Sequence, residues 1–102
     1  MEDINQVTMV CRLTAAPELK GSVLPMRLAY TTRAKDGDQW LDKSNYIDAV
    51  VFGRVAEALE PMLDKGTRVA VAGYLQMDEW TTRDGDKRSA TKIVCRSVQI
   101  VD

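Results

Sequence analysis

The 102-residue chain contains no histidine, and its two cysteines, Cys11 and Cys95, are far apart in the sequence. Without histidine, the chain cannot form a histidine-ligated metal site or the histidine-dependent triads of hydrolases. The cysteines also lack the C-x-x-C spacing of zinc and redox motifs. We expect both thiols to be reduced and to pack as small apolar side chains, with a disulfide within or between chains as the alternative.

The chain also lacks a long apolar run and an excess of either charge. No segment approaches the roughly 18 consecutive apolar residues of a membrane helix. The N-terminal residues 1–3 are acidic, where a secretory signal would be basic. We therefore predict a cytoplasmic protein without membrane contact. Because the formal net charge is only -1, any attraction for a polyanion must come from local patches of charge.

Apolar and polar residues alternate in five segments, as they do in half-buried β-strands. The predicted strands cover residues 7–14, 26–33, 44–52, 67–77 and 88–100. Apolar residues recur at helical spacing over residues 55–63, but Pro61 removes a hydrogen bond there. We expect a short, kinked helix or two single turns. An Asp-Gly turn at residues 83–86 would join the last two strands.

This order of elements predicts an all-β fold. A five-stranded barrel with one short helix between strands three and four is the oligonucleotide/oligosaccharide-binding (OB) architecture. We predict a single domain of this kind across residues 1–102. Two charged loop tips, residues 35–38 and 83–86, would then border the binding groove of the barrel.

The third predicted strand carries the most informative pattern. Its alternation places Ile47, Ala49 and Val51 toward the core, and Tyr46 and Phe52 on the opposite face together with a carboxylate. Exposed aromatic rings on a strand form a natural platform for unpaired bases. Phe52 has a competing interpretation, because near a strand end it could close the barrel or lie in a subunit interface.

Two tryptophans and several basic side chains are further candidates. Trp80 precedes the charged hairpin turn and shares no apolar stripe, so we favour ligand contact; Trp40 is either a second contact or an ordinary loop residue. Asp78 and Glu79 should weaken the attraction for phosphate beside Trp80. The loop tips would supply phosphate contacts, with simple exposure to solvent as the alternative, from Arg33, Lys35, Arg83, Lys87 and Arg88.

Several motifs resemble those of bacterial single-stranded DNA-binding proteins. The third strand and helix start of that family resemble YIDAVVFGRVAE at residues 46–57, and its helix end resembles LDKGTRV at residues 63–69. Its last hairpin resembles GYLQ at residues 73–76, Trp80, and DGDKR at residues 84–88. The likeness covers nearly the whole chain in the same order.

The resemblance implies an OB fold that binds single-stranded DNA without sequence preference, in replication, repair or recombination. It implies no catalysis and no cofactor. Tyr46, Phe52 and Trp80 fall on positions where family members stack bases, and Arg54 falls on a commonly basic position. The fourth aromatic position is Ala34 in this chain, with Trp40 a few residues later as a candidate substitute.

The resemblance also implies an assembly and partners. It predicts a homotetramer, with a dimer as the alternative, and replication or repair proteins as partners. A long apolar first strand over residues 4–13 is a candidate for pairing across a two-fold axis. Family members typically continue into a flexible segment with an acidic tip, whereas this sequence stops at Asp102. We therefore expect a tailless or truncated relative.

Two other functions compete with DNA binding. A primosomal replication protein of similar length and the same fold would mainly dock a protein partner, with weak DNA affinity and little loss on Trp80→Ala. An enzyme would need clustered carboxylates around a metal. The best acidic cluster, Asp36, Asp38 and Asp42, is better explained as solvated turn chemistry, so we expect neither catalysis nor a bound metal.

Overall fold

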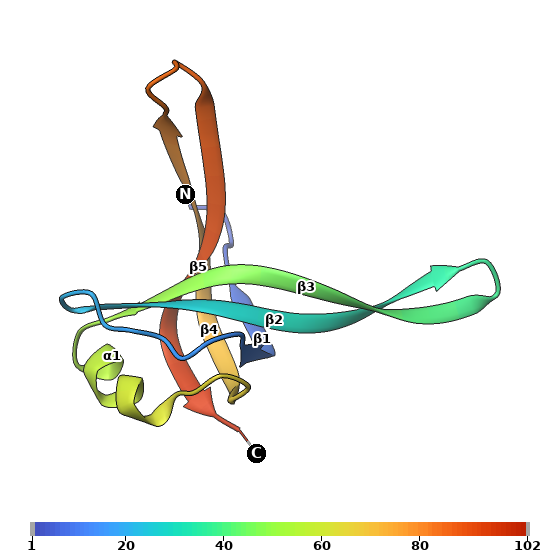
Figure 1. Cartoon of the computed structure of the whole chain (residues 1–102), viewed down its shortest axis with the longest axis horizontal. Helices are drawn as coiled ribbons and strands as arrows, with labels where there is room; N and C mark the ends of the chain where they lie inside the picture. The colour runs from blue at the N-terminus through green and yellow to red at the C-terminus, as the bar shows by residue number, and fades with distance from the viewer. Residues whose placement is uncertain (1, 102) are drawn as a thin grey trace.

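The computed structural model describes residues 2–101, which form a closed barrel of five strands with one short helix (Figure 1). The elements in chain order are β1 (Val7–Leu13), β2 (Val23–Asp36), β3 (Gln39–Phe52), α1 (Gly53–Leu59), β4 (Arg68–Thr81) and β5 (Lys87–Ile100). Around the barrel the strands follow the order β1-β2-β3-β5-β4. The predicted five-stranded barrel, with its helix between the third and fourth strands, is confirmed.

The barrel closes around side chains from one face of each strand. Strand β3 runs parallel to β5, and the other neighbouring strands are antiparallel. The largest fully enclosed side chains are Leu13, Leu24, Leu28, Val51, Val69, Val71 and Ile93. Each such side chain contributes about 1.5–3 kcal/mol relative to exposure. Ala56 and Leu59 of α1 join the same cluster, so the helix covers one end of the barrel.

The helix is short because glycine and proline define its limits. Gly53 has a φ of 74°, which permits the sharp turn from β3 directly into α1. Pro61 lies in a single 3₁₀ turn, Glu60–Met62, that follows α1. Proline is tolerated at the start of such a turn, where its missing N–H would have no partner. The expectation of a short helix is confirmed, and a separate 3₁₀ turn at the proline follows it. No helix within residues 2–101 is long and apolar enough to cross a bilayer.

The β2–β3 hairpin is longer than predicted. Of the expected loop at residues 35–38, only Gly37 and Asp38 form the turn, because pairing continues as far as Asp36 and Gln39. Gly37, with a φ of 64°, forms part of the two-residue turn at the tip. Residues 31–44 are exposed on both faces of the hairpin, so the alternation that reveals a half-buried strand is absent there.

The β4–β5 hairpin also extends beyond the barrel and points in a different direction from the β2–β3 hairpin (Figure 1). Its strands are paired as far as Thr81 and Lys87. The predicted Asp84-Gly85 turn is present, and the Thr82 N–H donates to the Asp86 carbonyl oxygen at 2.8 Å. The two hairpins thus form two arms on one barrel.

A bulge lies where the β4–β5 hairpin leaves the barrel. Gly73 is the last residue of β4 that pairs with β1, and the β4–β5 register shifts between Ala72 and Gly73. A Cβ atom at Gly73 would lie 1.9 Å from the Val94 carbonyl oxygen. The backbone of β5 therefore occupies the space that any other side chain would need, and only glycine fits there.

Strand β1 begins at Val7, so the predicted apolar strand over residues 4–13 is three residues too long. Ile4 is 95% exposed. Beyond Val7, the side chain of Asn5, and not its backbone, continues the hydrogen bonding to β4. The Asn5 amide nitrogen donates to the Leu75 carbonyl oxygen at 2.8 Å, and the Leu75 N–H donates to Asn5 Oδ1 at 2.9 Å. Asn5 thereby satisfies both backbone polar groups of Leu75 just beyond the end of the β1–β4 ladder.

Both cysteines are free thiols in the core, as expected for small apolar side chains. Burial raises the pKa of Cys95 to about 11, and the nearby Cys11 adds to the rise. Burial also raises the pKa of Cys11, although Arg12 partly opposes the effect. Thiols that ionise with such difficulty are poor nucleophiles, which fits a packing role.

Candidate nucleic-acid interface

Three aromatic rings share one face of β3. Trp40, Tyr46 and Phe52 are spaced six residues apart, and side chains alternate along the uninterrupted β3 strand. The three are 56%, 56% and 50% exposed. Successive rings are about 20 Å apart along the strand, so each could contact a different base. We call this face, which points away from the core, the outer face. Not all of it is open, because Val50 is buried beside Val94 of β5.

The structure corrects the placement of the predicted loop residues. Arg33 and Lys35 lie in β2, and Trp40 lies in β3, so all three belong to the paired part of the hairpin. Lys35 pairs directly with Trp40. The Arg33 guanidinium lies over the Trp40 ring, 5.5 Å from its centroid. The hairpin therefore presents an aromatic ring with cations beside it.

Trp40, the candidate substitute for an aromatic residue at Ala34, does not share a face of the hairpin with Ala34. Ala34 pairs with Leu41, the neighbour of Trp40 in β3. Because neighbouring residues of a strand point to opposite faces, Ala34 and Trp40 lie on opposite faces of the hairpin.

The second group of predicted residues gathers on the β4–β5 hairpin. Trp80 is 50% exposed and pairs directly with Arg88 across the two strands. Both line a shallow surface cavity of about 570 Å³, together with Lys87. Arg88 also lies 3.7 Å from Asp86 in a long ion pair. Arg83 is exposed in the turn beyond them. The structure therefore brings Trp80 and the basic residues of this hairpin together.

Asp78 is not an unpaired carboxylate beside Trp80. Its Oδ2 atom lies 2.9 Å from Lys92 Nζ, and its Oδ1 atom accepts a hydrogen bond from Gln76 Nε2 at 3.0 Å. These two contacts lower the pKa of Asp78. Glu79 lines the same cavity as Trp80. Lys92 therefore offsets the charge of Asp78, whereas the Glu79 carboxylate still opposes a phosphate beside Trp80.

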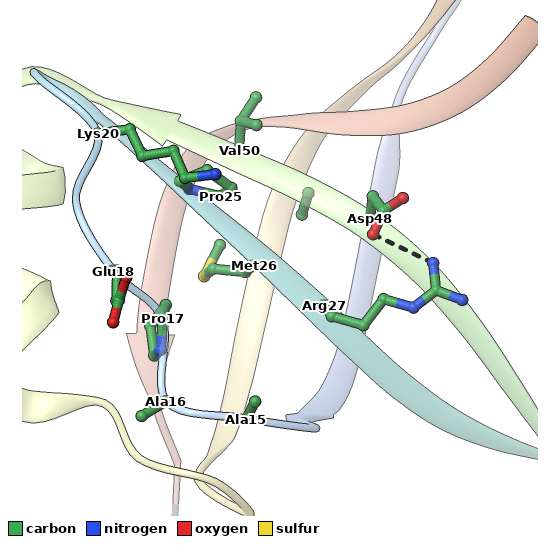
Figure 2. Close-up of a pocket in the computed structure, with 11 residues that line it drawn as sticks. Ala15, Ala16, Pro17, Glu18, Lys20, Pro25, Met26, Arg27, Asp48 and Val50 are labelled. Atoms are coloured by element: carbon green, nitrogen blue, oxygen red, sulfur yellow. Dashed lines mark hydrogen bonds and ion pairs between the residues drawn. The ribbon is translucent and has the colours of Figure 1, made fainter.

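Sequence reasoning missed Arg27 as a site residue. Arg27 pairs with Asp48 across β2 and β3, and its Nη1 atom lies 3.1 Å from Asp48 Oδ1. Its guanidinium also lies 5.6 Å from the centroid of the Tyr46 ring. Figure 2 shows this ion pair beside a cavity of about 370 Å³, lined by the β1–β2 loop and by parts of β2 and β3. Alternation within β2 places Arg27 on the same face as Arg33, which was the available signal.

Phe52 and Arg54 lie at the other end of β3 from the hairpin tip. Phe52 is the last residue of the strand and pairs with Val23. Arg54 is exposed in the first turn of α1. The structure therefore does not bring Arg54 together with the basic residues of either hairpin.

The outer face continues from one hairpin to the other. Asp48 of β3 pairs with Lys92 of β5, and Lys92 contacts Asp78 of β4. Tyr46 and Trp80 therefore belong to one surface that crosses three strands, β3, β5 and β4. Within residues 2–101, no group of three or more His, Cys, Asp or Glu side chains could hold a metal ion. The arrangement provides rings and cations for a polyanion with exposed bases.

Comparison with known proteins identifies relatives that are single-stranded DNA-binding proteins. The model of the single-strand binding protein family matches residues 4–101. The single-stranded DNA-binding protein of Treponema pallidum is 37% identical over 106 residues, which cover 99% of this chain and 60% of that protein. The one from Borreliella burgdorferi is 38% identical, covering 98% of this chain and 71% of that protein. This chain thus spans about 60% of the length of the first relative.

Solved structures show the same fold. A deletion mutant of the single-stranded DNA-binding protein from Thermus aquaticus superposes with a TM-score of 0.84 at 27% identity, covering 97% of this chain and 51% of that one. Plasmodium falciparum SSB, solved in complex with ssDNA, superposes with a TM-score of 0.87 at 23% identity, covering 100% and 98% of the two chains. From its barrel and its match over residues 4–101, this chain belongs to the single-strand binding protein family.

Proposed function

We propose that this chain binds single-stranded DNA with little sequence preference, as a non-catalytic protein of replication, repair or recombination. Bases would stack on Trp40, Tyr46, Phe52 and Trp80. Phosphates would contact the basic side chains of the two hairpins and of the start of α1, namely Arg33, Lys35, Arg54, Arg83, Lys87 and Arg88. The observation that carries the proposal is the continuous outer face, which presents half-exposed rings on two hairpins of one barrel.

The physical terms favour a ligand with exposed bases over a duplex. An aromatic ring that is half exposed in the free protein can stack on a base without first unfolding its surroundings. Each such stack contributes about 1–3 kcal/mol and tolerates any base. Cations beside the rings add an electrostatic contribution to the affinity that weakens as the salt concentration rises. The slope of log affinity against log salt concentration is about -0.7 for each phosphate neutralised. The names of the relatives from T. pallidum and B. burgdorferi support the same ligand.

Titration with oligo-dT at two salt concentrations tests the proposal. We expect quenching of Trp40 and Trp80 fluorescence and an affinity that falls with salt. Trp80→Ala should weaken binding about five- to 150-fold, as expected from the loss of one base stack. Met77→Ala is the matched control, because Met77 is exposed on the opposite face of the same strand. Oligo-dT that neither quenches fluorescence nor binds in a salt-sensitive way would refute single-strand binding.

A module that mainly docks a protein partner remains the second candidate. The exposed apolar side chains of Leu75 and Met77, on the opposite face of the β4–β5 hairpin, favour it. This function predicts weak affinity for oligo-dT and little change on Trp80→Ala. The same two variants therefore separate the two functions, since docking would be weakened by Met77→Ala and DNA binding by Trp80→Ala.

We also propose that the chain forms a homotetramer, with a dimer as the alternative. Val10 of β1 is half exposed, and β1 pairs with β2 through Arg12 and Leu13 while residues 7–11 pair with β4. One edge of β1 is thus available to a second copy. Light scattering of the purified chain measures the number of subunits, and a monomeric mass would contradict the proposal.

A further inference from the structure

Four charged side chains form a row across the outer face, where the hairpin that carries Tyr46 joins the hairpin that carries Trp80. In the order of the strands they are Asp78 on β4, Lys92 on β5, Asp48 on β3 and Arg27 on β2. We call this set the charged row. Its signs alternate from strand to strand. Ion pairs link Asp78 to Lys92 at 2.9 Å and Asp48 to Arg27 at 3.1 Å, while Asp48 and Lys92 are direct neighbours in the parallel β3–β5 pairing.

Every cation of the charged row already has a carboxylate partner within the protein. The row holds two positive and two negative side chains, so its net charge is zero. Gln76 holds Asp78 in place through a hydrogen bond to Oδ1. A strand that stacks on both Tyr46 and Trp80 has to cross from one hairpin to the other, and the charged row lies where the two hairpins join. Its phosphates would have to compete with Asp48 for Arg27 and with Asp78 for Lys92.

Both ion pairs are weak enough for a DNA phosphate to replace the carboxylate. The side chains of the Arg27–Asp48 pair are 52% and 58% exposed, and those of the Lys92–Asp78 pair are 28% and 44% exposed. Ion pairs with this degree of exposure are worth little, because water competes for both partners and salt screens them. A phosphate, which carries several strong acceptor oxygens, can therefore replace either carboxylate.

We propose that Asp48 and Asp78 are internal competitors for phosphate, which hold Arg27 and Lys92 and thereby reduce both the affinity for single-stranded DNA and its salt dependence. This inference rests on the proposed function of the chain. In the protein without DNA, Asp48 also keeps the Arg27 guanidinium beside the Tyr46 ring. The two carboxylates tune how tightly the outer face holds a strand, so that bound DNA can be released.

The test compares oligo-dT binding by the wild-type chain with Asp48→Asn and Asp78→Asn at several salt concentrations. Each variant should bind roughly two- to fivefold tighter, as expected from the strength of an exposed ion pair. The slope of log affinity against log salt should steepen by up to about 0.7 per variant, because one more cation is free to neutralise a phosphate. Glu57→Gln is the matched control, since Glu57 is exposed on α1, away from the charged row.

A double-mutant cycle shows whether the gain acts through the paired cation. The tighter binding of Asp48→Asn should disappear in an Arg27→Met background, and that of Asp78→Asn in a Lys92→Met background. Unchanged affinity and slope in both asparagine variants would overturn the proposal, and so would weaker binding. An equal gain in Glu57→Gln would also overturn it, because the effect would then come from net charge alone. If the wild-type chain itself does not bind oligo-dT, the proposed function fails first.

Discussion

Replacement of Gly73 by alanine should destabilise this fold more than any other change of similar size. A Cβ at Gly73 would lie 1.9 Å from the Val94 carbonyl oxygen, 2.8 Å from the Val94 carbonyl carbon and 2.9 Å from the Cys95 Cα. All three are backbone atoms of β5, so no side-chain rotation can relieve the overlap. The β4–β5 pairing must open locally, at the point where the hairpin that carries Trp80 leaves the barrel.

The cost follows from what this opening breaks. Roughly two ladder hydrogen bonds would be lost, each worth about 0.5–1.5 kcal/mol net. The buried side chains of Val94 and Cys95 would also be displaced, and overpacking of a core typically costs about 1–3 kcal/mol. We therefore expect a loss of about 3 kcal/mol or more in the free energy of unfolding, out of the roughly 5–15 kcal/mol typical of a native domain.

Urea unfolding followed by circular dichroism measures this loss. With a denaturant slope of about 1.5 kcal/mol/M, a loss of about 3 kcal/mol lowers the unfolding midpoint by about 2 M. Protein concentration must be the same in all samples, because an oligomer is stabilised by mass action. If Gly73→Ala unfolded at the wild-type midpoint, the close packing of β5 against Gly73 would be wrong.

Gly85→Ala is the control for backbone conformation. Gly85 has a φ of 85° but nothing within 4 Å of its missing Cβ. Alanine there should cost only about 1–2 kcal/mol, the penalty of a left-handed conformation. A larger loss from Gly85→Ala than from Gly73→Ala would show that turn conformation, and not the close approach of β5, limits the stability of this hairpin.

Three further predictions concern the rings, the core and the thiols. Trp40→Ala and Tyr46→Ala should each weaken oligo-dT binding about five- to 150-fold. Because the two rings are about 20 Å apart, the effects of the two substitutions on log affinity should add in fluorescence-polarisation titrations. Strong non-additivity would mean that the two rings contact the same base. Leu28→Ala, at a fully buried position, should cost about 2–5 kcal/mol in urea unfolding, and a near-neutral result would contradict the assigned core. The pKa of Cys95 rises from 9.0 to about 11 on folding. The neutral thiol therefore contributes its full stabilisation below pH 9, and this contribution is lost as the pH rises toward about 11. In pH-dependent urea unfolding, a Cys95→Ala variant should lack this part of the decline in stability, and an unchanged decline would contradict the burial of the thiol.

Sequence patterns predicted the strands wherever one face is buried. Alternation identified β1 and the first half of β4, because Val69 and Val71 point into the core. The same rule failed over residues 34–43, where the β2–β3 hairpin stands clear of the barrel and both faces meet solvent. Pairing there is set by backbone hydrogen bonds and by the turn at Gly37, which leave no apolar period in the sequence.

Parts of the candidate interface could be predicted for the same reason. The period of two places Tyr46 and Phe52 on one face whatever the rest of the fold does. Alternation could place Arg27 on the same face as Arg33, but its ion pair with Asp48 depends on the β2–β3 register, which the sequence does not show. The charged row was equally hidden, because the parallel pairing of β3 with β5 joins residues that are far apart in the chain.

The two hairpins are joined by a short parallel contact, in which Asp48–Val50 pair with Lys92–Val94. Trp40 and Tyr46 lie on one arm and Trp80 on the other. An oligonucleotide that reaches a single arm gains only that arm's contacts. Once it is long enough to bridge both, the second contact becomes intramolecular, with the high effective concentration of a tethered ligand. Affinity should therefore rise abruptly at a threshold length, rather than by equal steps for each added nucleotide.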